Sequence, residues 1–317
     1  MAKILITGGT GFLGKRLGKK FKESGHDVVL TARNNKQNSL AREYSGCEVL
    51  AIDVSSIESV RDIVTQVKPE AIIHAAATKF VDISEKQPME TIDINVVGSQ
   101  NVARVAIDKG VRLVIGISTD KASPPIRNTY GLTKALMERL FCSMDGKSPT
   151  RFLCVRYGNV AWSTGSVMGI WRKMLKETGV IGTTGPEMLR FFFTVDEAVE
   201  LVETAFEHVE ELRGKVLARK MKSAKMEEIL KVWTTQEGGR YERITGRPGE
   251  RDVEYLIGEM ELPYTMECSY NGIDHYVISF NQRVDSPLQY ALSSANAERL
   301  TEQEIIALIN DLPVEEL

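Results

Sequence analysis

Short apolar runs alternate with amphipathic stretches through the first half of the chain. The apolar runs are rich in β-branched residues and almost continuous in apolar character, as in strands buried on both faces of a parallel sheet. They are KILIT (3–7), DVVLTAR (27–33), EVLAIDV (48–54), AIIHAAA (71–77), RLVIGIST (112–119) and RFLCVRY (151–157). Helical patterns fill the intervals between them. This alternation predicts an α/β fold, a Rossmann-type doubly wound parallel sheet with right-handed crossovers.

The regular alternation stops near Arg156. Beyond this point glycine, proline and charged residues are scattered among short elements, with one helical pattern near 193–209 and another at 301–311. We expect residues 1–155 to form the Rossmann domain, which also receives the helix near 193–209. Residues 156–317 are expected to form mainly a smaller C-terminal lobe across the strand ends.

Composition narrows the class of protein. The 317 residues are 43% hydrophobic and 26% charged with a net charge of −3, so nothing electrostatic favours a nucleic-acid partner. Cys47, Cys142, Cys154 and Cys268 are widely spaced and form neither a CxxC motif nor a Cys/His cluster, which favours free thiols over a disulfide or metal site. A strand begins within three residues of the N-terminus and no apolar run approaches ~20 residues. We therefore expect a cytoplasmic protein that does not span the membrane.

The first strand runs directly into a glycine-rich loop and then a helix. Glycines at 8, 11 and 14 permit a tight turn and allow backbone N–H groups to approach a pyrophosphate at the helix N-terminus. A purely structural turn is the alternative, but the strand before and the helix after favour a dinucleotide site. The loop residues assigned to the cofactor are Gly8, Thr10, Gly11, Phe12, Leu13 and Gly14.

The end of the second strand discriminates between NAD and NADP. An NAD site expects an acidic residue there for the ribose 2′-hydroxyl, whereas this chain has Arg33, Asn34 and Lys36 with no acid nearby. Arginine and lysine neutralise a 2′-phosphate, so NADP is favoured. NAD, with Arg33 stacked on its adenine, is the alternative. Further cofactor contacts are expected after the third and fourth strands, at Asp53, Val54, Ala75, Ala76 and Ala77.

Tyr130 and Lys134 form a Y-x-x-x-K pattern at the start of a predicted helix. Side chains four residues apart share one helical face, so the ammonium is expected near the phenol, where it favours phenol deprotonation. A phenolate beside a nicotinamide accepts a hydroxyl proton while hydride leaves the same carbon. A solvated Tyr/Lys face is the usual reading of such a pattern, but its position after a dinucleotide fold favours catalysis.

These motifs together resemble the extended short-chain dehydrogenase/reductase superfamily over nearly the whole chain. The narrower resemblance is to UDP-N-acetylglucosamine 4,6-dehydratases, and within them to the soluble C5-inverting branch of pseudaminic-acid and related L-sugar pathways. The membrane-bound retaining branch usually carries Met at the position of Tyr130. The motifs that carry the resemblance are TGGTGFLG (7–14), HAAA (74–77), STDKA (118–122), YGLTK (130–134), VRYGNV (155–160), GSV (165–167), LRFFFTVDEAVELV (189–202) and GRPGER (246–251).

The resemblance assigns a role to the adjacent acid and base in STDKA. Lys121 would remove the C5 proton, Asp120 would protonate the departing C6 hydroxyl, and Thr119 would bind the C4 hydroxyl beside Tyr130. For Lys121 to act as a base near neutrality, its pKa must fall through burial or through a neighbouring cation, for which Lys134 or Lys79 is the candidate. A salt-bridged surface turn is the bland alternative for this pair.

The same resemblance implies further contacts. Asn95 would organise a water near the catalytic lysine, or it is a helix-bending polar residue of the core. Arg190 and Arg247 would grip the nucleotide diphosphate, with surface ion pairs as the alternative. Val160 is assigned to the cofactor, and the expected substrate contacts are Lys79, Asn159, Ser163, Ser166, Val167, Arg190, Arg247 and Glu250. No metal site is expected.

The sequence thus predicts an NADP-dependent hydro-lyase acting on a UDP-N-acetylhexosamine. A C5-retaining dehydratase, a nucleotide-sugar 4-epimerase and a non-catalytic NADP-binding sensor are the alternatives. The acid and base at 120 and 121 argue against an epimerase, and the intact Tyr130 and Lys134 argue against a sensor. The 162–167 loop lacks the arginine common in the family, which leaves the exact sugar open. Many relatives pair through helices, so a homo-oligomer is expected.

Overall fold

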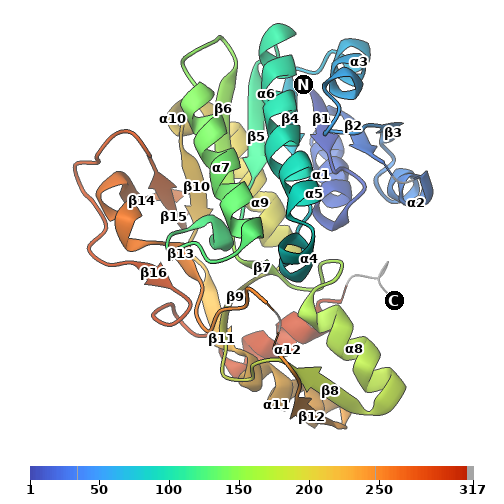
Figure 1. Ribbon diagram of the computed structural model, residues 1–317, viewed down its shortest axis with the longest axis vertical. Helices are drawn as coiled ribbons and strands as arrows, with labels where there is room; N and C mark the ends of the chain where they lie inside the picture. The colour runs from blue at the N-terminus through green and yellow to red at the C-terminus, as the bar shows by residue number, and fades with distance from the viewer. Residues whose placement is uncertain (34, 247, 313–317) are drawn as a thin grey trace.

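A nine-stranded sheet forms the centre of the molecule (Figure 1). The computed structural model describes residues 1–33, 35–246 and 248–312, with the backbone alone at 35 and 36. Seven strands are parallel, in the spatial order β3 (Glu48–Ala51), β2 (Asp27–Ala32), β1 (Lys3–Thr7), β4 (Ala71–His74), β5 (Leu113–Ile117), β6 (Arg151–Arg156) and β10 (Val216–Arg219). The predicted α/β, Rossmann-type parallel sheet is confirmed.

Helices cover both faces of the sheet, as expected for strands that are apolar on both sides. On one face α1 (Phe12–Glu23) packs against α9 (Val195–Glu207), and α2 (Asn35–Ser45) flanks α1. On the other face lie α3 (Ile57–Val67), α6 (Gly98–Asp108) and α7 (Thr129–Met144). The strand order reverses between β1 and β4, so a crevice opens beyond their carboxyl ends, where ligands of such sheets bind.

The sheet takes three strands from the part of the chain assigned to the C-terminal lobe. β10 continues the parallel order beside β6, and β15 (Ile273–Ile278) and β14 (Thr265–Tyr270) extend it antiparallel. The last two strands form a hairpin closed by Asn271 and Gly272, which have φ of 53° and 76°. Positive φ at both central residues is what a two-residue hairpin turn demands, and Asn-Gly meets it at little cost.

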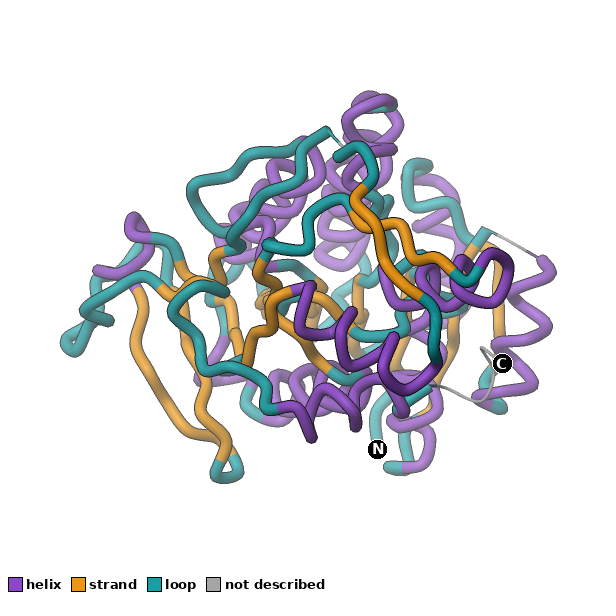
Figure 2. The backbone as a smooth tube through the Cα atoms, turned by 90° about the horizontal axis from the view of Figure 1, so that it is seen from below, coloured by secondary structure: helices purple, strands orange, loops and turns teal. Residues whose placement is uncertain are grey.

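The C-terminal lobe lies below the sheet in Figure 1 and toward the viewer in Figure 2. Its elements are β7 (Asn159–Val160), α8 (Val167–Thr178), β8 (Val180–Thr183), β9 (Leu189–Phe193), β11 (Lys222–Lys225), α11 (Met226–Glu237), β12 (Arg240–Arg243) and α12 (Glu302–Asn310). A separate apolar core holds Trp162, Trp171 and Trp233, together with Phe12 from the start of α1. Trp162 donates from Nε1 to the Leu308 carbonyl at 2.9 Å, which ties the loop before α8 to α12.

A buried ion triad of three charged residues, Arg156, Glu138 and Glu261, joins the end of β6 to α7 and to the turn before β14. Arg156, at the end of β6, is fully buried and donates to both carboxylate oxygens of Glu138 on α7, at 2.9 and 2.6 Å. The same guanidinium donates at 2.9 and 2.8 Å to Glu261 in the 3₁₀ turn η3 (Glu259–Tyr264). Glu261 also accepts from the Ser123 hydroxyl at 3.0 Å. One guanidinium thus fixes α7, η3 and the segment after β5.

Replacing Arg156 with leucine should lower the free energy of unfolding by about 3–5 kcal/mol, because Glu138 and Glu261 would be left as uncompensated buried charges. Urea unfolding near neutral pH measures this loss. Part of it should return at acid pH, where the two carboxylates accept protons. Arg61→Leu, which removes the exposed partner of Glu58, is the control and should change stability little. An Arg156→Leu protein as stable as the parent would contradict the role of the triad.

Candidate active site

The glycine loop is closed tightly around its own backbone. Gly8 has φ of 66°, and a Cβ there would lie 2.7 Å from the Ala76 nitrogen. A Cβ on Gly14 would lie 2.5 Å from the Gly8 carbonyl oxygen. Gly11 is the N-cap of α1 and offers no side chain to the free N–H groups of the first turn. This cradle has room for a phosphate group only because side chains are absent, and it fits the pyrophosphate of a dinucleotide.

The other predicted cofactor residues differ in how far they are buried. Thr10 is buried, and Phe12 is 6% exposed in the lobe's core, so a contribution of Phe12 to the loop would come from its backbone. Leu13 packs against both apolar cores. Arg33 is exposed immediately beyond β2. Asn34 and the side chain of Lys36 lie outside the described residues.

The segments after β3 and β4 line the same edge of the sheet. Asp53 accepts hydrogen bonds at one carboxylate oxygen from the backbone and hydroxyl of Ser55, at 3.0 and 2.7 Å. Val54 is buried, and its carbonyl accepts from the Asn101 amide at 3.0 Å. Ala75, Ala76 and Ala77 are half-buried and follow β4 directly. Their small size permits the backbone of this segment to approach Gly8 closely.

Asn95 lies in a π-helical turn, η1 (Asp93–Val97), between α5 (Pro88–Ile92) and α6. Its amide oxygen accepts from Thr78 N at 2.8 Å, and its amide nitrogen donates to the Thr78 carbonyl and the Thr133 hydroxyl, each at 3.0 Å. The side chain therefore clamps the segment after β4 to α7. Asn95 is thus a buried polar residue in a distorted helix, a feature common at functional sites, and its role toward a water near the catalytic lysine stays a prediction.

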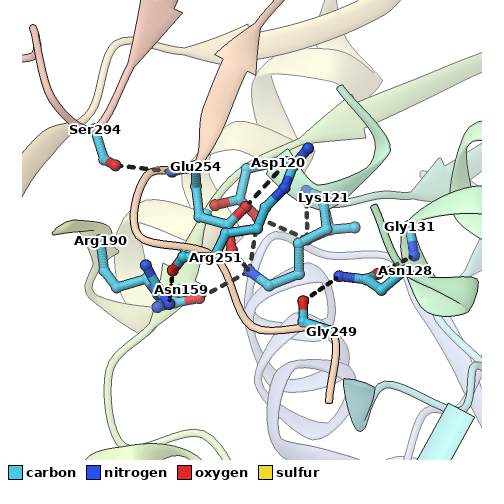
Figure 3. A network of polar contacts seen from close by, with 12 residues as sticks. Asp120, Lys121, Asn128, Gly131, Asn159, Arg190, Gly249, Arg251, Glu254 and Ser294 are labelled. Atoms are coloured by element: carbon cyan, nitrogen blue, oxygen red, sulfur yellow. Dashed lines mark hydrogen bonds and ion pairs between the residues drawn. The ribbon is translucent and has the colours of Figure 1, made fainter. Parts of the chain in front are cut away.

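Lys121 is the centre of a buried polar network (Figure 3). Its side chain is 15% exposed, and its ammonium donates to Asp120 Oδ1 at 3.0 Å and to Asn159 Oδ1 at 3.2 Å. A third oxygen, Oε1 of Glu254, lies 3.8 Å away. Asn159, which sequence reasoning gave to the substrate, thus accepts a hydrogen bond from Lys121. The Asp120–Lys121 pair is not a solvated surface turn.

Asp120 offers two different oxygens to the site. Oδ1 accepts from the Thr119 hydroxyl at 2.9 Å as well as from Lys121. Oδ2 is buried, and within the described chain nothing hydrogen-bonds to it. A Cβ on Gly158 would lie 3.2 Å from this oxygen and 2.6 Å from Phe191 Cβ, so only glycine fits there. A buried carboxylate oxygen without a partner is costly and is the kind of group that serves a ligand or a proton.

Tyr130 belongs to the same cluster. Burial raises the pKa of its phenol to about 12, although the nearby Lys121 charge and a hydrogen bond with Thr119 act to lower it. The start of α7 abuts the turn that holds Lys121, because a Cβ on Gly131 would lie 2.1 Å from the Lys121 carbonyl oxygen. Asn128 caps this helix by accepting from Gly131 N at 2.8 Å and reaches the Gly249 carbonyl at 3.3 Å.

Lys134 does not occupy the expected place beside the phenol. Its ammonium lies in the core, 3.4 Å from Met137 Sδ, and burial lowers its pKa to about 8. Its charge also helps to keep His74 neutral, although burial is the larger reason why the pKa of that imidazole falls to about 3. Among the described residues, the cation that favours ionisation of Tyr130 is Lys121. Tyr130 and Lys134 share one face of the helix, as their spacing predicts, but the Lys134 ammonium turns to Met137 and not to the phenol.

The expected fall in the pKa of Lys121 is also wrong for this structure. Burial lowers this pKa, but the carboxylates of Asp120 and Glu254 outweigh burial and raise it. The cation that acts in the lowering direction is Arg190, in place of the expected Lys134 or Lys79. The amine is therefore held as ammonium by two acids, one of which the sequence did not reveal.

Arg190 is buried and is not a surface ion pair. It donates to the Arg251 carbonyl at 2.6 Å and to the Leu189 carbonyl at 2.9 Å. Arg251 and Glu254 were missed by sequence reasoning, and both are buried, with Arg251 NH1 donating to Glu254 Oε2 at 3.4 Å. The only sequence signal is their position directly after the GRPGE stretch, where alternating charges resemble a solvated turn.

The remaining predicted substrate residues lie mostly on loops. Ser163, Ser166 and Val167 form the turn into α8, where Ser166 N donates to the Ser163 carbonyl at 2.7 Å. Phe80 packs on this turn, since a Cβ on Gly165 would lie 2.3 Å from its ring. Lys79 lies over the Phe80 ring at 5.7 Å, Glu250 accepts from the Thr184 hydroxyl at 3.1 Å, and Val160 continues β7. Arg247 lies outside the described residues.

Fold and site together define a Rossmann-type protein of the nucleotide-sugar epimerase and dehydratase class. A family model described as polysaccharide biosynthesis protein matches residues 4–272, and the chain belongs to this family. A UDP-glucose 4-epimerase of Rickettsia conorii is 33% identical over 96% of this chain and 94% of its own length. The X-ray structure of Pen from Bacillus thuringiensis superposes with a TM-score of 0.90 at 27% identity, covering 98% of both chains.

The fold is shared more distantly with TunA, an NAD-dependent NDP-hexosamine 5,6-dehydratase of tunicamycin biosynthesis. The TM-score is 0.69 at 20% identity, over 80% of this chain and 87% of TunA. Each helix in the described part of the chain is too short or too polar to cross a bilayer.

Replacing Lys134 with methionine should raise the free energy of unfolding at pH 7 by about 2–3 kcal/mol, because it removes a buried ammonium whose pKa is lowered to about 8. Between that value and the ordinary lysine pKa the unfolded chain binds more protons than the folded one, so parental stability rises with pH in this window. The gain from Lys134→Met should therefore shrink above pH 8. Urea unfolding at several pH values measures both effects, and a destabilised Lys134→Met protein would contradict the burial argument.

Proposed function

We propose that the protein is an NADP-dependent dehydratase that converts UDP-N-acetylglucosamine to a UDP-4-keto-6-deoxy-N-acetylhexosamine, with inversion at C5. The observation that carries the proposal is the buried Asp120–Lys121 pair next to Tyr130, at the carboxyl edge of the sheet. Oxidation at C4 alone requires only a group such as Tyr130. Elimination across C5 and C6 also requires a base for the C5 proton and an acid for the C6 hydroxyl.

The residues that would hold the dinucleotide fit its chemistry. The cradle of Gly8, Gly11 and Gly14 would take the pyrophosphate, and Arg33 would take the 2′-phosphate of NADP. When bound, the nicotinamide supplies reversible hydride transfer, which removes hydride from C4 and returns it to C6. NAD is the alternative, and the NAD dependence of TunA is consistent with it.

A single proton transfer within the Asp120–Lys121 ion pair would generate both the acid and the base of the reaction. Moving a proton from the Lys121 ammonium to Asp120 over the 3.0 Å hydrogen bond gives a neutral amine and a neutral acid with no change in net charge. Burial favours the uncharged form of such a pair, and substrate binding would remove the remaining water. Lys121 then takes the C5 proton and Asp120 gives its proton to the C6 oxygen, which restores the ion pair.

Tyr130 and Thr119 act at C4 in this scheme. Tyr130 would accept the C4 hydroxyl proton, and Thr119, which lies between Tyr130 and Asp120, would orient that hydroxyl. Because the pKa of Tyr130 is raised to about 12 even with the Lys121 charge nearby, a bound oxidised nicotinamide would have to supply the further positive charge that the phenol needs to ionise near neutrality. Lys134 remains a proposed catalytic and cofactor-binding residue, although its ammonium lies in the core beside Met137.

The substrate side of the cleft supports a UDP-N-acetylhexosamine. The groups proposed to contact it are Lys79, Asn159, Ser163, Ser166, Val167, Arg190, Arg247 and Glu250. Because Arg190 is committed to backbone carbonyls, it would act on the diphosphate through its charge and through the loop that it holds. We further propose a cytoplasmic homo-oligomer.

The similarity to UDP-glucose 4-epimerases favours a second candidate, a nucleotide-sugar 4-epimerase. An epimerase needs oxidation and reduction at C4 only, and it has no use for an acid and a base at C5 and C6. The buried Asp120 oxygen without a partner therefore favours dehydration. A C5-retaining dehydratase differs from the proposal only in its product. An NADP-binding sensor does not require Tyr130 and Lys134.

Incubation of the protein with UDP-N-acetylglucosamine in deuterated water, followed by NMR of the product, tests the proposed reaction. A 6-deoxy-4-keto sugar with deuterium at C5 and the inverted configuration is expected. A 4-epimer with its hydroxyl at C6 intact would replace the proposal by the epimerase, and retained configuration would replace it by the retaining dehydratase.

Lys121→Ala should still bind cofactor and UDP-sugar but should fail to exchange the C5 proton with solvent deuterium, because the base is removed. Asp120 would lose its ion-pair partner at the same time, so binding is measured first by calorimetry to establish that the site is intact. Normal exchange in this variant would refute Lys121 as the base.

Arg33→Ala should weaken NADP binding by at least about tenfold while leaving NAD binding nearly unchanged, since one charged contact to the 2′-phosphate is lost. Fluorescence titration with each dinucleotide measures the two affinities. Equal weakening of NADP and NAD would remove the argument for Arg33.

A further inference from the structure

Glu254 is a buried acid that no part of the proposed reaction uses. It precedes β13 (Tyr255–Ile257) and is 3% exposed. Its backbone is held on both sides by Ser294, since Glu254 N donates to the Ser294 hydroxyl at 3.0 Å and Ser294 N donates to the Glu254 carbonyl at 2.8 Å. The main chain that carries this side chain is therefore anchored at both its N–H and its carbonyl.

The carboxylate of Glu254 is divided between two cations. Oε2 accepts from Arg251 NH1 at 3.4 Å, and Oε1 lies 3.8 Å from the Lys121 ammonium (Figure 3). Burying a carboxylate requires one compensating cation, and Arg251 would be sufficient for that purpose. The second oxygen extends the network to Lys121, which thereby lies near two carboxylates, those of Asp120 and Glu254.

We propose that Glu254 is a positioning residue that holds the Lys121 amine beside Asp120 and Tyr130 and sets how readily that amine gives up and takes back its proton. The inference rests on the proposed function in one respect, that Lys121 is the base of the reaction. Glu254 itself need not touch the sugar.

Several neighbouring groups decide the charge state of Lys121. Four of them act on it directly: Asp120 on its own turn, Tyr130 on α7, Arg190 on β9 and Glu254 before β13. Arg251 acts through its contact with Glu254. Burial lowers the pKa of Lys121, and Asp120 and Glu254 together raise it above the ordinary value. Without Glu254, Asp120 alone would oppose the combined effect of burial and of the Arg190 guanidinium. The balance would then turn toward the neutral amine.

This arrangement has two opposite effects on catalysis. Glu254 disfavours the neutral amine at rest, so fewer molecules carry a free base at a given pH. Glu254 also stabilises the ammonium that forms when Lys121 takes the C5 proton, so the base is stronger when it acts. Removal of the charge should therefore shift the pH profile toward acid and lower the rate at its plateau.

Glu254→Gln tests the inference without depending on turnover. Protein labelled with ¹³C at the lysine ε-carbons is titrated by NMR, with the Lys121 signal assigned by its loss in Lys121→Ala. In the parent protein this carbon should keep its ammonium shift to about pH 10. In Glu254→Gln its midpoint should fall by about one to two pH units. An unchanged midpoint overturns the proposal.

Two further variants separate positioning from simple stability. Glu254→Asp keeps the charge and should restore most of the parental midpoint. Asp145→Asn removes a carboxylate with a 10% exposed side chain that pairs with Arg213 at 2.9 Å away from the site, so it should lower the melting temperature without moving the Lys121 midpoint. If Asp145→Asn moves the midpoint as far as Glu254→Gln does, the effect is global and the proposal fails.

The pH dependence of turnover by Glu254→Gln supplies the catalytic readout. The expected result is an acid shift of the kcat profile with a lower plateau and little change in KM for the UDP-sugar. A uniform loss at every pH contradicts the inference. If the NMR midpoint moves but neither protein dehydrates any UDP-hexosamine, the proposed function fails while the assignment of Glu254 to Lys121 stands.

Discussion

The buried pairing of Arg156 with Glu138 and Glu261 is the constraint on which the site depends. Each partner lies on a different element, and each element carries or adjoins a residue of the proposed site. Tyr130 lies on α7, Glu254 precedes η3, and Ser123 lies two residues after Lys121. A buried ion triad of this kind adds little net stability compared with an apolar core, because desolvation offsets the attraction. Its value here is geometric, since α7, η3 and the end of β5 can dock in one way only.

The chemistry is consequently assembled from segments far apart in sequence. The turn after β5 supplies an acid and an amine, α7 supplies a phenol, β7 and β9 supply an amide and a guanidinium, and the chain before β13 supplies another acid. The close approach of Gly131 to the Lys121 backbone and of Gly158 to Asp120 shows how little space separates these segments. Charge in this cluster is balanced by neighbours and not by solvent, so each proton that moves alters the ionisation of every other member.

Sequence alone predicted the sheet, the glycine loop and the Asp120–Lys121 pair, because these depend on local pattern: continuous apolar runs, small residues at a turn, and a motif at a strand end. The β14–β15 hairpin was not predicted although Asn271-Gly272 signals it, since the signal fell within a stretch read as irregular. The displacement of Lys134 and the presence of Glu254 beside Lys121 could not be predicted. Both depend on which buried partner a long side chain finds, and that is a property of tertiary packing.

Phe12 begins α1, but its ring packs in the apolar core of the lobe and not in the core around the sheet. The glycine loop and the C-terminal lobe are thereby joined through one aromatic residue. A change in the conformation of the loop would alter the packing of the lobe, so the two parts of the chain are mechanically coupled.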